Sequence, residues 1–191
     1  MEPNKQESEL QAKDMTPSLV ARLRKGGTGA GALLDELYRD KLVRFCWGYL
    51  GNMEEAEDAV QDICYRVLAA TSVPDAFRPW LYKTARNQCF NLLRHRARHR
   101  EGQELPAASE VHEVLTGHLT RLVRNEQRSR LSELVRSLPE AQREVLRLRY
   151  VEDLPRPEIA EVLDIPESVV KSRLFEGLKQ LRKKASLLEN L

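Results

Sequence analysis

Apolar residues recur every three or four positions through most of the chain, which is the spacing of one buried helix face. Near the C-terminal end, two such segments flank a tight turn at Asp164-Ile165-Pro166, the first of them covering residues 156–163. Proline suits the first turn of a helix, because its missing N–H would have no partner there. No segment shows the period of two that a half-buried strand requires. The pattern therefore predicts an all-α fold that contains a helix-turn-helix.

The second helix of this motif has an apolar side and a basic side. The apolar side carries Val169, Val170, Leu174, Leu178 and Leu181. The other side carries the residues that we assign to duplex DNA, which are Ser168, Lys171, Ser172, Arg173, Phe175 and Lys179. A basic helix behind a tight turn is how a major-groove reader is built. The alternative is a helical hairpin whose lysines are merely solvated. The small Ala160, where the two helices cross, favours the interpretation as a DNA-binding motif.

The rest of the chain divides into further helices. They are expected at about residues 16–25, 30–50, 53–70, 77–100, 122–137 and 140–150. Thr16-Pro17 has the pattern of a helix cap followed by proline at the first helical position. The predicted organisation is a disordered extension, a first small helical domain, a flexible linker, a second small helical domain and a tail, at residues 1–15, 16–100, 101–121, 122–186 and 187–191.

The helix expected at 53–70 begins with acidic residues. Its apolar face is expected to consist of Ala56, Ala59, Val60, Ile63, Val67 and Leu68. Acids in a first turn suit the helix dipole, and this accounts for Glu54, Glu55 and Glu57. The helix dipole accounts less well for Gln61 and Asp62, which lie nearly two turns further along the helix. The side opposite the apolar face exposes Asp58, Gln61, Asp62 and Tyr65. We interpret this side as a docking surface for another protein.

The helix expected at 77–100 combines aromatic and basic residues. Its apolar face includes Trp80, Leu81, Ala85 and Cys89, and Trp80 is more simply explained as core than as a DNA contact. The remaining surface carries Arg78, Lys83, Arg86, Asn87, Asn91 and Arg94. Basic and amide groups beside aromatic rings hold phosphates and stack unpaired bases. This polar side is expected to be free to face DNA.

The distribution of charge strengthens the case for a nucleic acid. The chain of 191 residues has a formal net charge of only +2. No acid lies between Lys83 and Arg100, and no base lies between Glu54 and Asp62. Local asymmetry of this kind matters more than the total when the partner is a polyanion.

Several classes of protein and site are disfavoured. The three cysteines form no CxxC pair, so buried reduced thiols are expected rather than a metal site; these are Cys46, Cys64 and Cys89. No cofactor or small-molecule substrate is indicated. No apolar run reaches membrane-spanning length and the N-terminus is too polar for a signal peptide, so a cytoplasmic protein without membrane insertion is expected. An enzyme is disfavoured, because no nucleophile–base pair or glycine-rich phosphate loop accompanies the histidines, which are His95, His99, His112 and His118.

Three segments together resemble a known family. They read EAEDAVQDICYRVL (55–68), FRPWLYKTARNQCFNLLR (77–94) and SLPEAQREVLRLRYVEDLPRPEIAEVLDIPESVVKSRL (137–174). A helix-turn-helix alone occurs in many regulators, whereas its pairing with EDAVQD and WLYKTARN is highly specific. The chain resembles bacterial RNA polymerase sigma factors of the sigma-70 family, in the extracytoplasmic-function (ECF) type.

The resemblance implies roles for these segments. The EDAVQD helix would bind the clamp helices of the largest subunit of core RNA polymerase, and the last domain would meet the polymerase flap. The WLYKTARN helix would read and open the downstream promoter element, and the basic helix would read the upstream element as a duplex. The protein would then not be an enzyme, and an anti-sigma factor is expected as a further partner.

The chain also departs from the family pattern in three places. Val73-Pro74-Asp75 stands where a longer base-capturing loop is usual, so no base pocket is assigned there. Leu154-Pro155-Arg156-Pro157 replaces a serine or threonine cap, and Glu176 stands where an arginine is common. A DNA-binding regulator that is not a polymerase subunit remains the alternative. It would share the last domain but would not need the EDAVQD and WLYKTARN helices.

Overall fold

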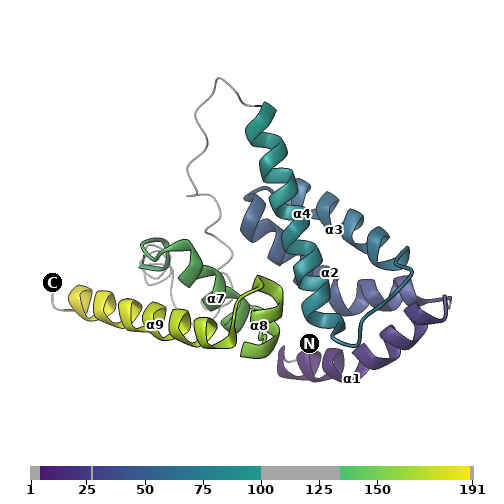
Figure 1. Cartoon of the computed structure of the whole chain (residues 1–191), viewed down its shortest axis with the longest axis horizontal. Helices are drawn as coiled ribbons and strands as arrows, with labels where there is room; N and C mark the ends of the chain where they lie inside the picture. Colours follow the sequence, from purple (N-terminus) through teal and green to yellow (C-terminus); the bar gives the residue numbers. More distant parts are fainter. Residues whose placement is uncertain (1–4, 27, 100–133, 190–191) are drawn as a thin grey trace.

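The computed structural model describes residues 5–26, 28–99 and 134–189, and every regular element in these ranges is a helix (Figure 1). The helices are α1 (Lys5–Arg24), α2 (Ala30–Leu50), α3 (Met53–Leu68), α4 (Phe77–His99), α7 (Glu140–Tyr150), α8 (Arg156–Leu163) and α9 (Glu167–Glu189). The all-α prediction is therefore confirmed for the described residues. None of these helices is sufficiently long and apolar to cross a membrane.

The predicted bounds of α2, α7 and α8 are confirmed. Gly51 ends α2 with φ of 69°, a left-handed conformation that glycine adopts without strain, and its N–H donates to the carbonyl of Trp47. The side chain of Asn52 then caps α3 by accepting a 3.1 Å hydrogen bond from the N–H of Glu55. The junction of these two helices is thus specified by two adjacent residues.

The predicted start of the first helix is wrong. Residues 5–15, expected to be disordered, belong to α1, and Pro17 lies inside this helix rather than at its first position. The segment KQESELQAKDM is rich in residues of high helix propensity, and one proline removes only one backbone donor. The hydroxyl of Thr16 lies 2.8 Å from the Tyr38 hydroxyl instead of capping a helix. Residues 1–4 lie outside the described part.

The first domain is built around α2, which contacts α1, α3 and α4. Phe45 is fully buried at its centre, where its ring meets the rings of Tyr49 and Tyr82 edge to face, with centroids 5.1 Å apart in both pairs. Trp80 is half-buried and packs on Phe77 at 5.8 Å, as expected for a residue of the apolar face. These contacts fix α4 against α2.

The last domain is the predicted helix-turn-helix together with α7. Asp164 ends α8 with φ of 53°, and its N–H donates to the carbonyl of Ala160. Gly177 lets α9 approach α7 closely, because a Cβ at this position would come within 3.0 Å of Leu146 Cδ1. The helix α9 continues to Glu189, into the segment 187–191 that was designated a tail. The predicted linker at 101–121, and the helix predicted at 122–137 except its last residues, lie outside the described residues.

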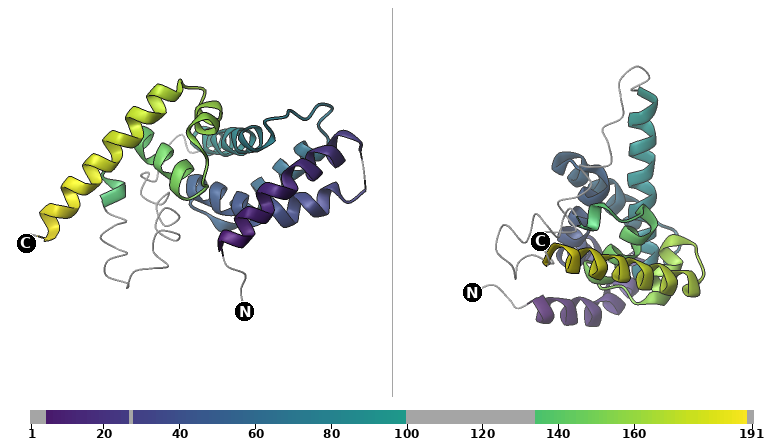
Figure 2. Two further views of the ribbon diagram at one scale, coloured as in Figure 1. Left: turned by 90° about the horizontal axis from the view of Figure 1, so that it is seen from below. Right: turned by 90° about the vertical axis from the view of Figure 1, so that its left-hand side faces the viewer.

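The two domains pack against each other, with α8 lying along α4 (Figure 1). The left view in Figure 2 shows α9 running away from the helices of the first domain. The contact with the first domain is made by α8 and α7. Buried apolar residues of both domains belong to one continuous cluster. This contact was not predicted, because the sequence pattern was interpreted as two separate domains.

Candidate polymerase and nucleic-acid interfaces

The predicted docking surface lies on the exposed side of α3. Asp58, Gln61 and Tyr65 are exposed, and 76 % of Tyr65 is accessible to solvent. Asp62 is also exposed, but its carboxylate accepts a 2.9 Å hydrogen bond from the buried amide of Gln88 on α4. Asp62 therefore helps to hold α3 against α4, in addition to any contact that it makes outside the chain.

Leu68 extends this surface, and the sequence pattern assigned it to the wrong side. It was counted with the apolar face of α3, yet 48 % of the residue is exposed. The spacing of three between Tyr65 and Leu68 places them on neighbouring parts of the helix surface. An apolar pair beside two polar residues is a typical composition for a protein interface.

The polar side of α4 is divided into two parts, and the expectation that all of it is free to face DNA is wrong. Asn87, Asn91 and Arg94 are exposed, and Arg94 Nη2 donates to Asn91 Oδ1 at 2.7 Å. The other three predicted residues contact the last domain; these are Arg78, Lys83 and Arg86. The two domains thus share a surface that sequence analysis assigned to DNA.

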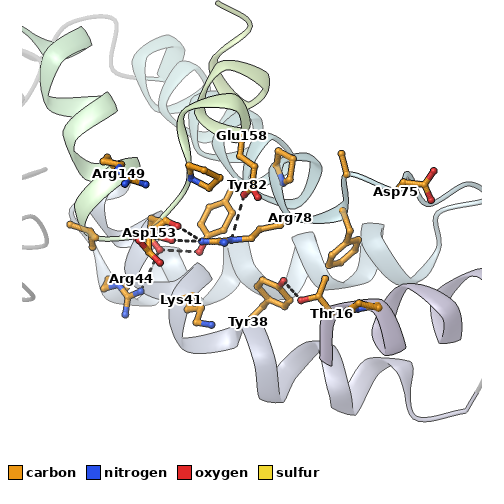
Figure 3. A pocket seen from close by; sticks show the side chains of 17 residues that line it. Thr16, Tyr38, Lys41, Arg44, Asp75, Arg78, Tyr82, Arg149, Asp153 and Glu158 are labelled. Carbon is orange, nitrogen blue, oxygen red and sulfur yellow. Dashed lines mark hydrogen bonds and ion pairs between the residues drawn. The ribbon is translucent and has the colours of Figure 1, made fainter. Parts of the chain in front are cut away.

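Arg78 and Lys83 bind groups at the two ends of α8. The guanidinium of Arg78 donates to the carbonyls of Glu152 and Asp153, at 2.7 and 2.8 Å, and lies 3.7 Å from the carboxylate of Glu158 (Figure 3). Lys83 Nζ donates to Asp164 Oδ1 at 2.5 Å. Each of these two cations therefore has acceptors within the protein.

Arg86 is paired with a carboxylate that sequence analysis did not identify. Arg86 Nε donates to Glu144 Oε1 at 2.8 Å, and the Tyr49 hydroxyl donates to the same oxygen at 2.5 Å. Burial alone would raise the pKa of Glu144, but the hydrogen bonds from Arg86 and Tyr49 and the charges of Arg86 and Arg147 lower it below its ordinary value. Glu144 is thus held ionised between the domains.

The lowered pKa of Glu144 predicts a pH dependence of the contact between the domains. The ionised form is favoured in the contact, so Glu144 stabilises the contact above its ordinary pKa of 4.5, and this stabilisation is lost as the pH falls through the lower value. We expect the radius of gyration in small-angle scattering to rise on acidification below that range. Glu144→Gln should remove this part of the profile, and identical profiles for the two proteins would contradict the prediction.

Glu152 is the second acid that the sequence did not reveal. Its side chain is 0 % exposed, and Oε2 accepts hydrogen bonds from the Tyr82 hydroxyl at 3.0 Å and from Arg44 Nη2 at 3.3 Å. Burial and the neighbouring carboxylate raise the pKa of Tyr82, which keeps its hydroxyl a donor. A cavity of about 440 Å³ borders this group and is lined from both domains (Figure 3). A carboxylate in a turn is normally solvated. The burial of Glu152 therefore follows from the packing of the two domains and not from the local sequence.

The second helix of the helix-turn-helix, α9, has an apolar side and a basic side, as predicted. Val170 and Leu174 are buried, and 64 % of Phe175 is exposed. Arg173 is half-buried. The remaining members of the predicted duplex-binding set are exposed, namely Ser168, Lys171, Ser172 and Lys179. The basic side of α9 is therefore accessible while much of the basic side of α4 is covered.

The loop before α4 is fastened to α1. Arg24 donates to the carbonyl of Val73 from Nε at 3.0 Å and from Nη2 at 2.8 Å, and it also pairs with Asp75 at 2.7 Å. The short loop that lacks a base pocket in the sequence is thus held by a neighbouring helix.

Cys46 and Cys89 are buried free thiols, as predicted, and Cys64 is half-buried. In the described part of the chain, no three His, Cys, Asp or Glu side chains gather in a possible metal site.

Two family models match the chain. The model described as sigma-70 region 2 covers residues 34–99, and the model described as sigma-70 region 4 covers residues 128–181. The first match contains α3 and α4, and the second contains the helix-turn-helix. The first model therefore contains the candidate surfaces on α3 and α4, and the second contains the candidate residues on α9.

Similar proteins of known family span nearly the whole chain. The ECF RNA polymerase sigma factor SigW of Bacillus subtilis is 29% identical over 181 residues, which are 88% of this chain and 96% of that protein. The ECF RNA polymerase sigma-E factor of Escherichia coli is 30% identical over 181 residues, which are 89% of this chain and 94% of that protein. Similarity of this extent covers both domains rather than the helix-turn-helix alone.

Solved structures agree on the fold. CnrH, in complex with the cytosolic domain of CnrY, matches with a TM-score of 0.62 at 21% identity over 91% of this chain and 96% of that one. The sigma factor RpoE of Bartonella quintana, in complex with the anti-sigma factor NepR, matches with a TM-score of 0.57 at 18% identity over 91% and 98% of the two chains. Sigma factors as a family direct core RNA polymerase to promoters and are not enzymes. The chain belongs to this family: it is an RNA polymerase sigma factor of the sigma-70 family, in the ECF type.

Proposed function

We propose that three exposed faces of the chain, on α3, α4 and α9, have separate roles in transcription initiation. The exposed side of α3 binds core polymerase, the polar side of α4 reads and opens the downstream promoter element, and the basic side of α9 reads the upstream element as a duplex. The observation that carries this proposal is that α3 presents its polar side outward in the same domain whose α4 presents amides and arginines. A regulator with only a helix-turn-helix has no need of this first domain.

The docking surface consists of Asp58, Gln61, Asp62 and Tyr65, extended by Leu68. Its acidic and amide groups complement a basic partner surface, and its exposed tyrosine and leucine supply apolar area to bury. The clamp helices of the largest polymerase subunit are the proposed partner. The polymerase flap is the proposed partner of the last domain.

The double variant Asp58→Ala with Gln61→Ala is expected to weaken binding to core polymerase. Both side chains are exposed on α3, so the variant should keep native helicity while it loses polar contacts in the complex. Asp62 is left unchanged because its hydrogen bond to Gln88 stabilises the domain. Affinity is measured by titration of labelled sigma factor with core enzyme, and Glu36→Ala with Asp40→Ala on α2 serves as the control. Unchanged affinity in the first variant would refute the docking assignment.

Readout of unpaired downstream DNA is assigned to α4. Asn87 and Asn91 supply donors and acceptors for base edges, and Arg94 supplies a positive charge beside them. Arg78, Lys83 and Arg86 add cations for the backbone once the last domain has moved away. Because Asn87, Asn91 and Arg94 are already exposed, these three residues would contact DNA before the other three.

Readout of the upstream duplex is assigned to α9. Lys171 and Arg173 donate to guanine edges or phosphates, and Ser168 and Ser172 serve either purpose. Phe175 offers a large apolar surface for a thymine methyl group, and Lys179 reaches the backbone further along the groove. The start of α9 at Glu167 adds main-chain donors for a phosphate.

Regulation, location and the absence of catalysis are further parts of the proposal. CnrH and the Bartonella quintana RpoE were each solved in complex with a second protein, and NepR is described as an anti-sigma factor. By analogy, an anti-sigma factor binds this chain and keeps it from acting until transcription from its promoters is required. The chain acts in the bacterial cytoplasm, where core polymerase is found, and without a catalytic reaction of its own.

Transcription in vitro tests the proposed function. The full chain is mixed with core polymerase and genomic fragments, and RNA start sites are mapped. Start sites that appear only with the chain present, upstream of which two sequence elements recur, are the expected result. Failure to bind core polymerase, with retained binding to duplex DNA, would instead identify a regulator that is not a polymerase subunit.

A further inference from the structure

We propose that Glu176 reads a cytosine in the upstream promoter element. Its carboxylate accepts a hydrogen bond from the N4 amine of that base in the major groove, and it disfavours the other bases at the same position. The inference rests on the proposed assignment of α9 to the upstream duplex. It adds a residue to the DNA-binding set on α9 and names the base that this residue selects.

Glu176 lies on the same side of α9 as residues assigned to DNA. Ser172 precedes it by four positions and Lys179 follows it by three, and these spacings align side chains on one face of a helix. All three side chains are exposed. Val170 and Leu174, on the opposite side of α9, are buried. A duplex that contacts Ser172 and Lys179 therefore also meets the carboxylate between them.

The carboxylate of Glu176 is not neutralised by the described part of the chain. It makes no hydrogen bond or ion pair with any described residue, although Lys179 is only one turn away. Glu167, the other exposed acid of α9 within residues 167–186, is paired with Arg156, whose Nε lies 3.4 Å from Glu167 Oε1. Glu176 therefore brings an uncompensated negative charge to the side of α9 that is assigned to DNA.

An uncompensated carboxylate opposes DNA of any sequence, because the phosphates repel it. This cost is offset only where a base edge offers the carboxylate a hydrogen-bond donor. In the major groove, guanine and thymine present acceptors, adenine presents its N6 amine beside the N7 acceptor, and cytosine presents its N4 amine without an acceptor. Cytosine therefore suits the carboxylate best. Rejection of the other bases is a repulsive element, and such elements supply specificity.

The neighbours of Glu176 indicate where this cytosine lies in the element. Four residues of a helix span about 6 Å, and successive base pairs are about 3.4 Å apart. Where α9 follows the groove, the base read by Glu176 therefore lies about two pairs from the one that meets Ser172. Phe175, the adjacent residue, is 64 % exposed and is assigned to a thymine methyl group. A cytosine close to a thymine is the predicted preference.

A binding selection measures the base preference at each position. Holoenzyme assembled from the full chain and core polymerase is mixed with a pool of duplexes that carry a mapped promoter with only its upstream element randomised, and the bound fraction is sequenced. The test variants are Glu176→Ala, which removes the charge, and Glu176→Arg, which replaces the acceptor with donors. Glu161→Ala is the matched control, because it removes the same charge from an exposed position on α8 of the same helix-turn-helix. Alanine favours helices, so both alanine variants should keep the fold.

The unchanged chain should prefer cytosine at one position of the upstream element. Glu176→Ala should lower this preference by about fivefold or more, while the preferences at the other positions persist. Glu176→Arg should favour guanine at or beside the same position, because a guanidinium donates to O6 and N7 of guanine. The control Glu161→Ala should keep every preference of the unchanged chain.

Two results with Glu176→Ala would overturn the inference: unchanged preferences at every position, or loss of a preference for a base other than cytosine. Lys171→Ala with Arg173→Ala tests the assignment of α9 separately. If this variant also leaves all upstream preferences unchanged, the proposed function of α9 fails as well. If it abolishes them while Glu176→Ala does not alter them, only the reading of cytosine fails.

Discussion

Phe45→Ala is expected to lower the free energy of unfolding of the first domain by about 3–5 kcal/mol. Phe45 is fully buried on α2, where its ring packs edge to face against Tyr49 and Tyr82. Truncation removes apolar area and both ring contacts and leaves a cavity in a rigid cluster. Because Tyr82 belongs to α4, the loss also loosens the helix assigned to downstream DNA.

Urea denaturation followed by tryptophan fluorescence isolates this effect. The two tryptophans, Trp47 and Trp80, both belong to the first domain, so the signal reports that domain alone. The matched control is Phe175→Ala, the same chemical change at a position of which 64 % is exposed. It should leave the free energy of unfolding nearly unchanged and weaken upstream duplex binding instead. A midpoint for Phe45→Ala equal to that of the control would contradict the central place of Phe45 in the core.

Asn87→Ala with Asn91→Ala is expected to impair promoter opening while polymerase docking and upstream binding persist. The two amides are exposed one turn apart on α4, and they lie outside the contact with the last domain. Each good contact to a base is worth about 1–3 kcal/mol. Since every 1.4 kcal/mol corresponds to a factor of about ten, loss of both should reduce open complexes by about tenfold or more.

Permanganate reactivity of unpaired thymines measures opening directly at a promoter mapped with the unchanged chain. Occupancy is matched beforehand by titrating the sigma factor and core enzyme, and Glu36→Ala with Asp40→Ala again controls for surface substitution in the same domain. Thymines should stay unreactive with the amide variant and react normally with the control. Normal reactivity with the amide variant at equal occupancy would show that another element opens the DNA.

The sequence by itself determined the helices, their faces and the family. Local rules suffice for the helices and their faces: the spacing of apolar residues, glycine after α2, and proline beside the turns. The family followed from the three motif-bearing segments. The basic side of α9 and the exposed side of α3 followed from the same periodicity, because a helix surface depends on neighbours along the chain. Even so, the start of α1 was misjudged, since Thr16-Pro17 has the form of a cap, while the helical propensity of residues 5–15 continues the helix through it.

Only the tertiary structure decided which side of α4 is covered. The pairs that close the domains join residues 58 to 108 positions apart, such as Arg86 with Glu144 and Arg44 with Glu152. No periodicity along the chain connects residues so distant, and Glu144 or Glu152 resembles any solvated acid until its burial is known. The same separation explains why Arg78, Lys83 and Arg86 were expected to be free. Whether a charged side chain meets water, DNA or a carboxylate depends on which domain packs against it, and that is a property of the folded chain.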